Sequence, residues 1–400
     1  MKTFSEYKNI SKNLQIKESV SLQYTLFPKD KEELKHMIAI EIAKQGYSAD
    51  LNHIDVSNIK DLSKLFEGSK FCGDISKWDV SNATSMYRMF SYSCFNGDIS
   101  NWNVSNVTNM SYMFEYAKNF NQDLSGLDVS NVTNMSSMFQ GAEAFNGDLS
   151  DWDVSNVTDM SYMFNGCKSF SQDLSGWDVS NVTYMKEMFS FSKFNGDIST
   201  WDVRNVTDMN GMFLNSAFNG NLKRWNTKNV ENMIGMFCSS KFNQDISKWN
   251  VSNVKYMSSM FQGSNFNQDI SEWNVSNVIF MNFMFNKNSG FNQDLSRWDV
   301  SKVTSMDSMF EGAKSFNQDI SKWNVSEVKY MGHMFRGAES FNQDISNWNV
   351  SNVNDMGYMF EGAESFNQDL SGWDVSCVKN NDYMFKDCPC PKEHQPRFKQ

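Results

Sequence analysis

One aspartate recurs every 24 or 25 residues along most of the chain, which makes it the first candidate for chemistry. The column contains Asp50, Asp74, Asp98, Asp123, Asp148, Asp173, Asp197, Asp245, Asp269, Asp294, Asp319, Asp344 and Asp369, with Asn221 at the one remaining position. Calcium prefers several oxygen ligands, so a row of these carboxylates is a candidate cation site. We favour the alternative that each carboxylate accepts backbone N–H groups and shapes its own loop, because Asn221 replaces one of them and no EF-hand pattern is present.

Other side chains that could catalyse a reaction are few and scattered. The histidines are His36, His53, His333 and His394, and no acid–base pair, nucleophile constellation or phosphate-binding glycine loop stands out. The seven cysteines are odd in number and dispersed, which does not indicate a disulfide framework. The close pair Cys388-Pro389-Cys390 offers too few ligands for zinc. We therefore predict a protein that is not an enzyme, with no catalytic residue, no metal and no cofactor.

The composition restricts the partners. A formal net charge of −11 over 400 residues, without a basic stripe, argues against a nucleic-acid partner, whose phosphates need clustered Lys and Arg. No run of 18 apolar residues is present, so we expect no membrane insertion. The first twenty residues lack the apolar stretch of a secretory signal, which predicts a cytoplasmic location or non-classical export.

All these residues lie on a strict sequence repeat. The twelve tryptophans occupy one column, in steps of 24 or 25 residues once Leu127 fills the single gap, and Ile54 takes the column one step before Trp78. Of the 27 methionines, all but Met1 and Met37 belong to a V-x-x-M-x-x-M-F phrase. A period of this length indicates stacked units that cannot bury their apolar side alone, and we count fourteen of them.

Within one unit, the apolar spacing changes from that of a strand to that of a helix. In I-S-N-W-N-V-S-N-V, Trp348 and Val350 should point inward and Asn349 outward, as in the short strand of a leucine-rich repeat. Residues 353–360 then have the period of a short helix. The predicted fold is an α/β leucine-rich-repeat-like solenoid of about fourteen coils, each with a short strand and a short helix.

The chain divides into four parts on this pattern. Residues 1–19 are polar and aperiodic and predict a flexible lead-in. Residues 20–49 combine a strand pattern at 20–26 with a helix pattern at 29–45, which predicts an N-terminal cap over the apolar end of the first coil. The solenoid is expected over residues 50–387 and a C-terminal tail over residues 388–400.

The aromatic and methionine columns predict the core, because they fill every coil at regular spacing and methionine fits irregular gaps. Representative core residues are Trp273, Trp298, Trp323, Trp348, Met257, Met260 and Phe261. The asparagines of the F-N and V-S-N phrases predict side chain-to-backbone hydrogen bonds in tight turns. The N-V-T triplets also match the glycosylation pattern. Turn formation explains their recurrence in almost every coil better than glycosylation does.

The phrase FNQDIS-x-W-x-VSNVT-x-M-x-x-MF, repeated over residues 50–387, resembles the BspA-like leucine-rich-repeat surface proteins, a type abundant in mycoplasmas. This resemblance implies a leucine-rich-repeat-like solenoid. It also implies display at a cell surface and a role in adhesion or host-protein binding.

Function should lie where a column varies. The residue before each tryptophan changes from coil to coil, and solenoids present extended binding surfaces on such outward strips. We predict a candidate concave strip whose most charged part is Lys248, Glu272, Arg297 and Lys322, with simple solvation of these side chains as the alternative. The favoured function is a protein-binding or adhesion module with a protein partner. Structural assembly of a cell or virion surface through self-association is the alternative.

Aromatic residues also recur between the paired methionines, on the side of the predicted helix. They are Tyr112, Tyr162, Phe283, Tyr358 and Tyr383. A lateral contact with a partner and packing against neighbouring loops both remain open for them.

Overall fold

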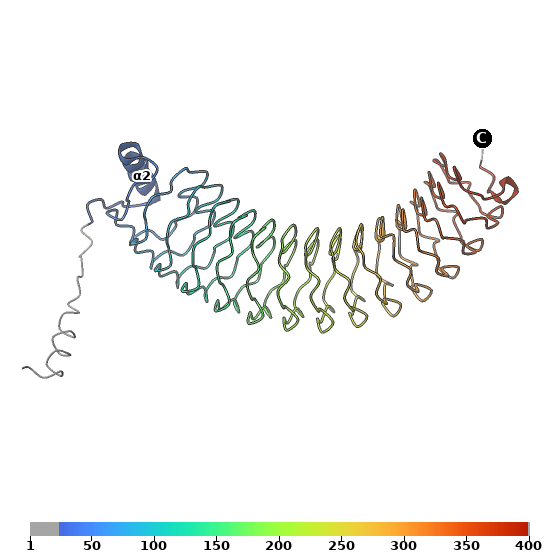
Figure 1. Cartoon of the computed structure of the whole chain (residues 1–400), viewed down its shortest axis with the longest axis horizontal. Helices are drawn as coiled ribbons and strands as arrows, with labels where there is room; N and C mark the ends of the chain where they lie inside the picture. The colour runs from blue at the N-terminus through green and yellow to red at the C-terminus, as the bar shows by residue number, and fades with distance from the viewer. Residues whose placement is uncertain (1–23, 399–400) are drawn as a thin grey trace, which may run out of the picture.

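The computed structural model describes residues 24–398, so the predicted lead-in and most of the predicted strand at 20–26 lie outside the described residues. The chain forms an arc of stacked coils, with α2 at one end and the C-terminus at the other (Figure 1). We number the coils 1 to 14, starting at Asp50, and use column for residues at equivalent positions in successive coils. Parallel bridges join one column from Asp61 to Asn380, so the chain is a repeat solenoid.

The helix α2 spans Lys31–Gln45 and lies against coil 1. Asp30 begins it, because the carboxylate accepts a first-turn backbone N–H at 2.9 Å, and Gly46 ends it with a φ of 85°. Leu34 and Ile38 are buried in the same apolar cluster as the first coil. The structure thus contains the helix predicted at 29–45, with a later start. In the described part of the chain, no helix is long and apolar enough to cross a membrane.

The segment from Met356 to Gly362 forms consecutive turns, so the prediction of a short helix in each coil is wrong. Tyr358 and Gly362 have left-handed φ values of 60° and 68°, and every coil repeats positive values at these two columns. Left-handed residues four positions apart interrupt the i to i−4 hydrogen bonds of a helix. The N–H groups alternate instead: Tyr358 donates to Asp382 O in the next coil at 2.8 Å, and Met359 donates to Met356 O at 3.2 Å.

The predicted strand around Trp348 is also absent from the described coils. Trp348 and Val350 are buried and Asn349 is exposed, as predicted, but the backbone turns on both sides of the tryptophan. Asp344 Oδ1 and Asn349 Oδ1 each accept the N–H two residues later, at 2.9 and 3.2 Å. Such Asx turns explain why Asp or Asn recurs at both positions. The bridge between coils forms at Asp355 instead.

The core is a set of parallel ladders of aromatic rings and methionines. Buried residues include Trp273, Trp298, Trp323, Trp348, Met257, Met260 and Phe261. Rings of equivalent residues stack nearly parallel, as Trp323 does on Trp348 with an interplanar angle of 2°. All twelve indole N–H groups donate to a backbone carbonyl of the preceding coil. The tryptophans can therefore be buried, because each indole N–H has a hydrogen-bond acceptor.

The solenoid is curved because the distance between successive coils, which we call the step, is smaller at one edge of the coils than at the other. Since equivalent residues are related by one step, the distance between their ring centroids measures that step locally. For buried rings that stack nearly parallel it is 5.6 Å at Phe335 and Phe360 and 6.5 Å at Trp348 and Trp373. The turns equivalent to residues 354–362 therefore form the inner edge of the arc, which we call the ladder edge. The tryptophan side forms the outer edge, which we call the wide edge.

Different groups join the coils at the two edges. Backbone N–H groups reach the neighbouring coil directly on the ladder edge. On the wide edge, Asn352 Nδ2 donates to Ser326 O at 2.7 Å, and Asn342 N–H donates to Asn317 Oδ1 at 3.0 Å. The asparagines that we expected to close turns within a coil therefore bridge neighbouring coils.

The C-terminal segment, which includes the short 3-10 helix η1 at Lys392–His394, packs on coil 14. Leu370 N–H of coil 14 donates to His394 O of this segment at 2.8 Å. Cys390 and Pro396 are buried there. Residues 388–398 thus extend the stacking by part of a turn.

Candidate functional site

The predicted strip of Lys248, Glu272, Arg297 and Lys322 lies in coils 9 to 12. All four side chains are exposed, and Glu272 forms an ion pair with Arg297 beside a hollow of about 240 Å³. The strip is on the wide edge, since each residue directly precedes a tryptophan and that column has steps of 6.3–6.5 Å. The prediction that the strip is concave is therefore wrong.

The inner edge carries the column that forms the bridges, which we call the ladder column. Ten of its members are small and polar: Asp61, Ser85, Asn109, Asn134, Asp159, Asp208, Asn232, Ser305, Asp355 and Asn380. The other four are aromatic: Tyr184, Tyr256, Phe280 and Tyr330. Backbone groups make the bridge in every coil, so it does not require an aromatic side chain.

Three of these aromatics, Tyr256, Phe280 and Tyr330, lie in coils 9 to 12. Ile279 and Phe283 of coil 10 lie beside them in the chain, and we call Tyr256, Ile279, Phe280, Phe283 and Tyr330 the aromatic patch. The rings of Tyr256 and Phe280 stack with centroids 6.0 Å apart. Phe280 is 39% exposed and Tyr330 is 50% exposed, while the other three are partly exposed. The inner edge thus presents apolar surface to solvent at this place.

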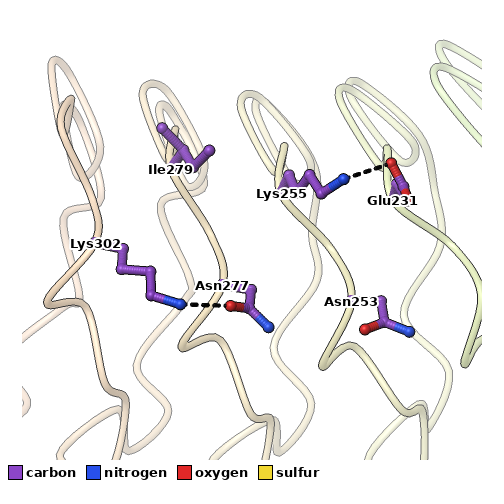
Figure 2. Close-up of a pocket in the computed structure, with 6 residues that line it drawn as sticks. All are labelled: Glu231, Asn253, Lys255, Asn277, Ile279 and Lys302. Carbon is purple, nitrogen blue, oxygen red and sulfur yellow. Dashed lines mark hydrogen bonds and ion pairs between the residues drawn. The ribbon is translucent and has the colours of Figure 1, made fainter.

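A hollow of about 460 Å³ adjoins the patch at Ile279 (Figure 2). It is lined by Glu231, Asn253, Lys255, Asn277, Ile279 and Lys302. Lys255 Nζ contacts Glu231 at 2.8 Å and Lys302 Nζ donates to Asn277 Oδ1 at 2.6 Å, so both cations are held at its rim. Lys302 stands where most coils have the asparagine that bridges to the preceding coil. The hollow therefore combines apolar and charged lining.

The acidic ladder shapes turns. From Asp74 to Asp369, each of its carboxylates accepts the N–H of the residue two positions later, and Asn221 does the same. The Ser346 backbone N–H and hydroxyl hold the pKa of Asp344 below its usual value. In the described residues, no group of three or more His, Cys, Asp or Glu is arranged to hold a metal ion.

Sequence reasoning singled out Phe283 but missed the other four residues of the aromatic patch. Irregularity of a column was considered only for the residue before the tryptophan. The ladder column varies as well, from Asp and Asn to Tyr256 and Phe280. Its importance becomes visible only when the inner edge is known.

Comparison with known families gives six overlapping matches to one family model, at residues 33–150, 123–217, 190–296, 214–320, 239–344 and 281–395. Together they span nearly the whole described chain. The chain belongs to this family, described as "Mycoplasma protein of unknown function, DUF285". The overlapping DUF285 matches follow the tiling of the coils. No curated protein matches the chain.

Among solved structures, this DUF285 chain is similar to the functional domain of InlJ from Listeria monocytogenes, whose description mentions a cysteine ladder. The two are 12% identical, with 78% of this chain and 69% of that chain covered and a TM-score of 0.37.

Proposed function

We propose that this chain is a non-enzymatic protein-binding module and that the aromatic patch, with the adjoining hollow, is its binding surface. The observation that carries the proposal is the replacement of small polar residues by Tyr256, Phe280 and Tyr330 in the ladder column. An exposed aromatic cluster rimmed by charges is typical of a protein interaction site.

Stacking between coils is the other explanation for aromatic residues in a bridged column. It applies to Tyr256 and Phe280, which stack on each other. It does not apply to Tyr330, because its ladder-column neighbours are Ser305 and Asp355 and half of its surface is exposed. An unstacked, exposed aromatic side chain favours recognition.

The chemistry of the surface indicates the kind of partner. Lys255 and Lys302 border the hollow and Lys329 directly precedes Tyr330, while Glu231 is the one acid of the lining. A protein surface with an apolar anchor and acidic residues around it would complement this arrangement. The BspA-like resemblance supports a partner met at a cell surface, in an adhesive role.

The test compares two variants of the full chain. In the ladder variant, Tyr256→Ser, Phe280→Asn and Tyr330→Ser install residues that other coils carry in the same column; in the strip variant, Lys248, Glu272, Arg297 and Lys322 are reversed in charge. Proteins from a host-cell surface fraction that the wild type captures are purified, and their Kd values are measured by calorimetry.

We expect the ladder variant to lose at least about tenfold in affinity and the strip variant to lose little. Equal affinity of the ladder variant and the wild type, with matching thermal unfolding, would contradict the assigned surface. Sedimentation analysis of the wild type and the two variants tests for self-association. If the wild type assembles as its concentration rises and the ladder variant does not, we would conclude that the partner is a second copy of this chain and not a foreign protein.

A further inference from the structure

Coils 7 and 8 depart from the repeat at several positions on the wide edge. The serine that follows V in the V-S-N phrase is present in every coil except these two, which have Arg204 and Lys228. Coil 8 also has Lys223 where coils 2 to 7 and 9 to 14 have serine, and Asn221 where all others have aspartate. The net result of these changes is three cations gained and one carboxylate lost.

One of these replacements, Arg204, shares a hollow with a second arginine. Arg204 and Arg224 line one hollow of about 460 Å³, together with Ser199, Thr200, Trp201, Asp202 and Asn226. Lys228 is the equivalent of Arg204 one coil later, and Asn229 Nδ2 ties the two coils by donating to Arg204 O at 2.8 Å. We call Arg204, Lys223, Arg224 and Lys228 the basic patch; all four are exposed.

The charges of the patch are only partly compensated. Arg204 Nε lies 2.7 Å from Asp202, and Lys223 Nζ lies 2.7 Å from Asp245. Among residues 24–398, Arg224 and Lys228 form no ion pair. Arg224, which has no ion-pair partner among these residues, thus adds positive charge to a hollow with hydroxyl and amide groups, on a chain whose net charge is −11.

We propose that this hollow binds a compact oxyanion ester, a phosphate or a sulfate group. Guanidinium groups present paired donors that match such oxygens, and Arg204 and Arg224 face the same space. A nucleic-acid backbone does not fit, because Trp201 and Trp225 are buried and offer no stacking face, and the acidic ladder continues on either side at Asp197 and Asp245. The ligand therefore carries one or two anionic groups on a small body.

The test is an NMR titration of the full chain labelled with ¹⁵N-arginine. Its sequence contains few arginines, so Arg204 and Arg224 can be assigned by substitution. The probes are glucose 6-phosphate and glucose 6-sulfate, which distinguish the two ester types, with glucose as the uncharged control. We expect the Nε signals of these two arginines to shift, with half-saturation near or below about 1 mM at low salt and weaker binding at high salt.

A reverting variant restores the residues of other coils: Arg204→Ser, Asn221→Asp, Lys223→Ser, Arg224→Asn and Lys228→Ser. It should fold, because each new residue stands at the same position in at least one other coil. Its affinity for the ester should fall at least about tenfold. The matched control, Arg297→Asn on the same edge, should bind like the wild type. Undiminished binding by the reverting variant, uniform shifts of all arginines, or equal shifts with glucose would overturn the proposal.

Discussion

The indole Nε1 of Trp348 donates a hydrogen bond to the backbone carbonyl of Ile320 in the preceding coil, at 3.1 Å. The same oxygen accepts the backbone N–H of Trp323 at 3.1 Å, so one carbonyl closes its own turn and anchors the next coil. A buried indole needs such a partner. The tryptophan column therefore provides both core volume and a bond between coils.

Trp348→Phe should destabilise the array by about 1–3 kcal/mol, because it removes this hydrogen bond and leaves a gap in a close-packed core. Urea unfolding followed by circular dichroism measures the change. Leu127→Trp is the reciprocal control, since it supplies the residue that the column has in neighbouring coils, and it should be neutral or stabilising. Equal midpoints for Trp348→Phe and the wild type would show that the bond contributes nothing.

Gly337→Ala should destabilise the array by about 1 kcal/mol, although there is room for the added methyl group. The nearest atom to the new Cβ is 3.9 Å away, whereas the φ of 64° is a conformation that side chains disfavour. Gly290→Ala is the control, because nothing lies within 4 Å of it and its φ is not in the left-handed region. A loss of stability that is the same for both variants would argue against backbone strain as the cause.

Acid should weaken the turns that the aspartates close. The N–H and hydroxyl of Ser346 lower the pKa of Asp344 in the folded chain, so the stabilisation is present above the ordinary pKa near 3.8 and is lost as the pH falls through the lowered folded value. Asp344→Asn keeps the acceptor, as Asn221 does, without the titration. Its unfolding midpoint should match the wild type at pH 7 and exceed it below pH 3; a pH profile parallel to the wild type would contradict this account.

Asn352→Ala should cost about 0.5–1.5 kcal/mol, because Ser326 O loses the donor that joins two coils on the wide edge. Thermal unfolding measures the loss. Ser351→Ala in the same turn leaves that bond in place and serves as the comparison. Similar midpoints for Asn352→Ala and Ser351→Ala would mean that the bridge is dispensable.

The repeat period, the inward residues and the position of α2 could all be predicted, because they depend on apolar spacing and on signals such as Asp30 and Gly46. The conformation of the coil could not. The spacing of Met356, Met359 and Phe360 suits a helix, but Tyr358 adopts a left-handed conformation that only bonding to the next coil stabilises. Non-local backbone bonds of this kind have no local sequence signal.

The strip was predicted on the wrong edge for a related reason. Curvature results from the difference between a 5.6 Å step at Phe360 and a 6.5 Å step at Trp373, and neither step can be read from a sequence. Without the curvature, the variable residues next to the tryptophans appeared to be the inner surface. Tyr330 and Phe280, which lie on the inner surface, were not singled out.

The different bonding of the two edges gives the arc a graded elasticity. Backbone bonds on the ladder edge resist stretching in every coil, whereas on the wide edge the resistance depends on individual side chains such as Asn352. At coils 11 and 12 the asparagine is replaced by Lys302 and Glu327, so the set of side-chain bonds differs from coil to coil. A load along the arc will therefore extend the wide edge more readily than the ladder edge, and the curvature of the inner surface will change with tension.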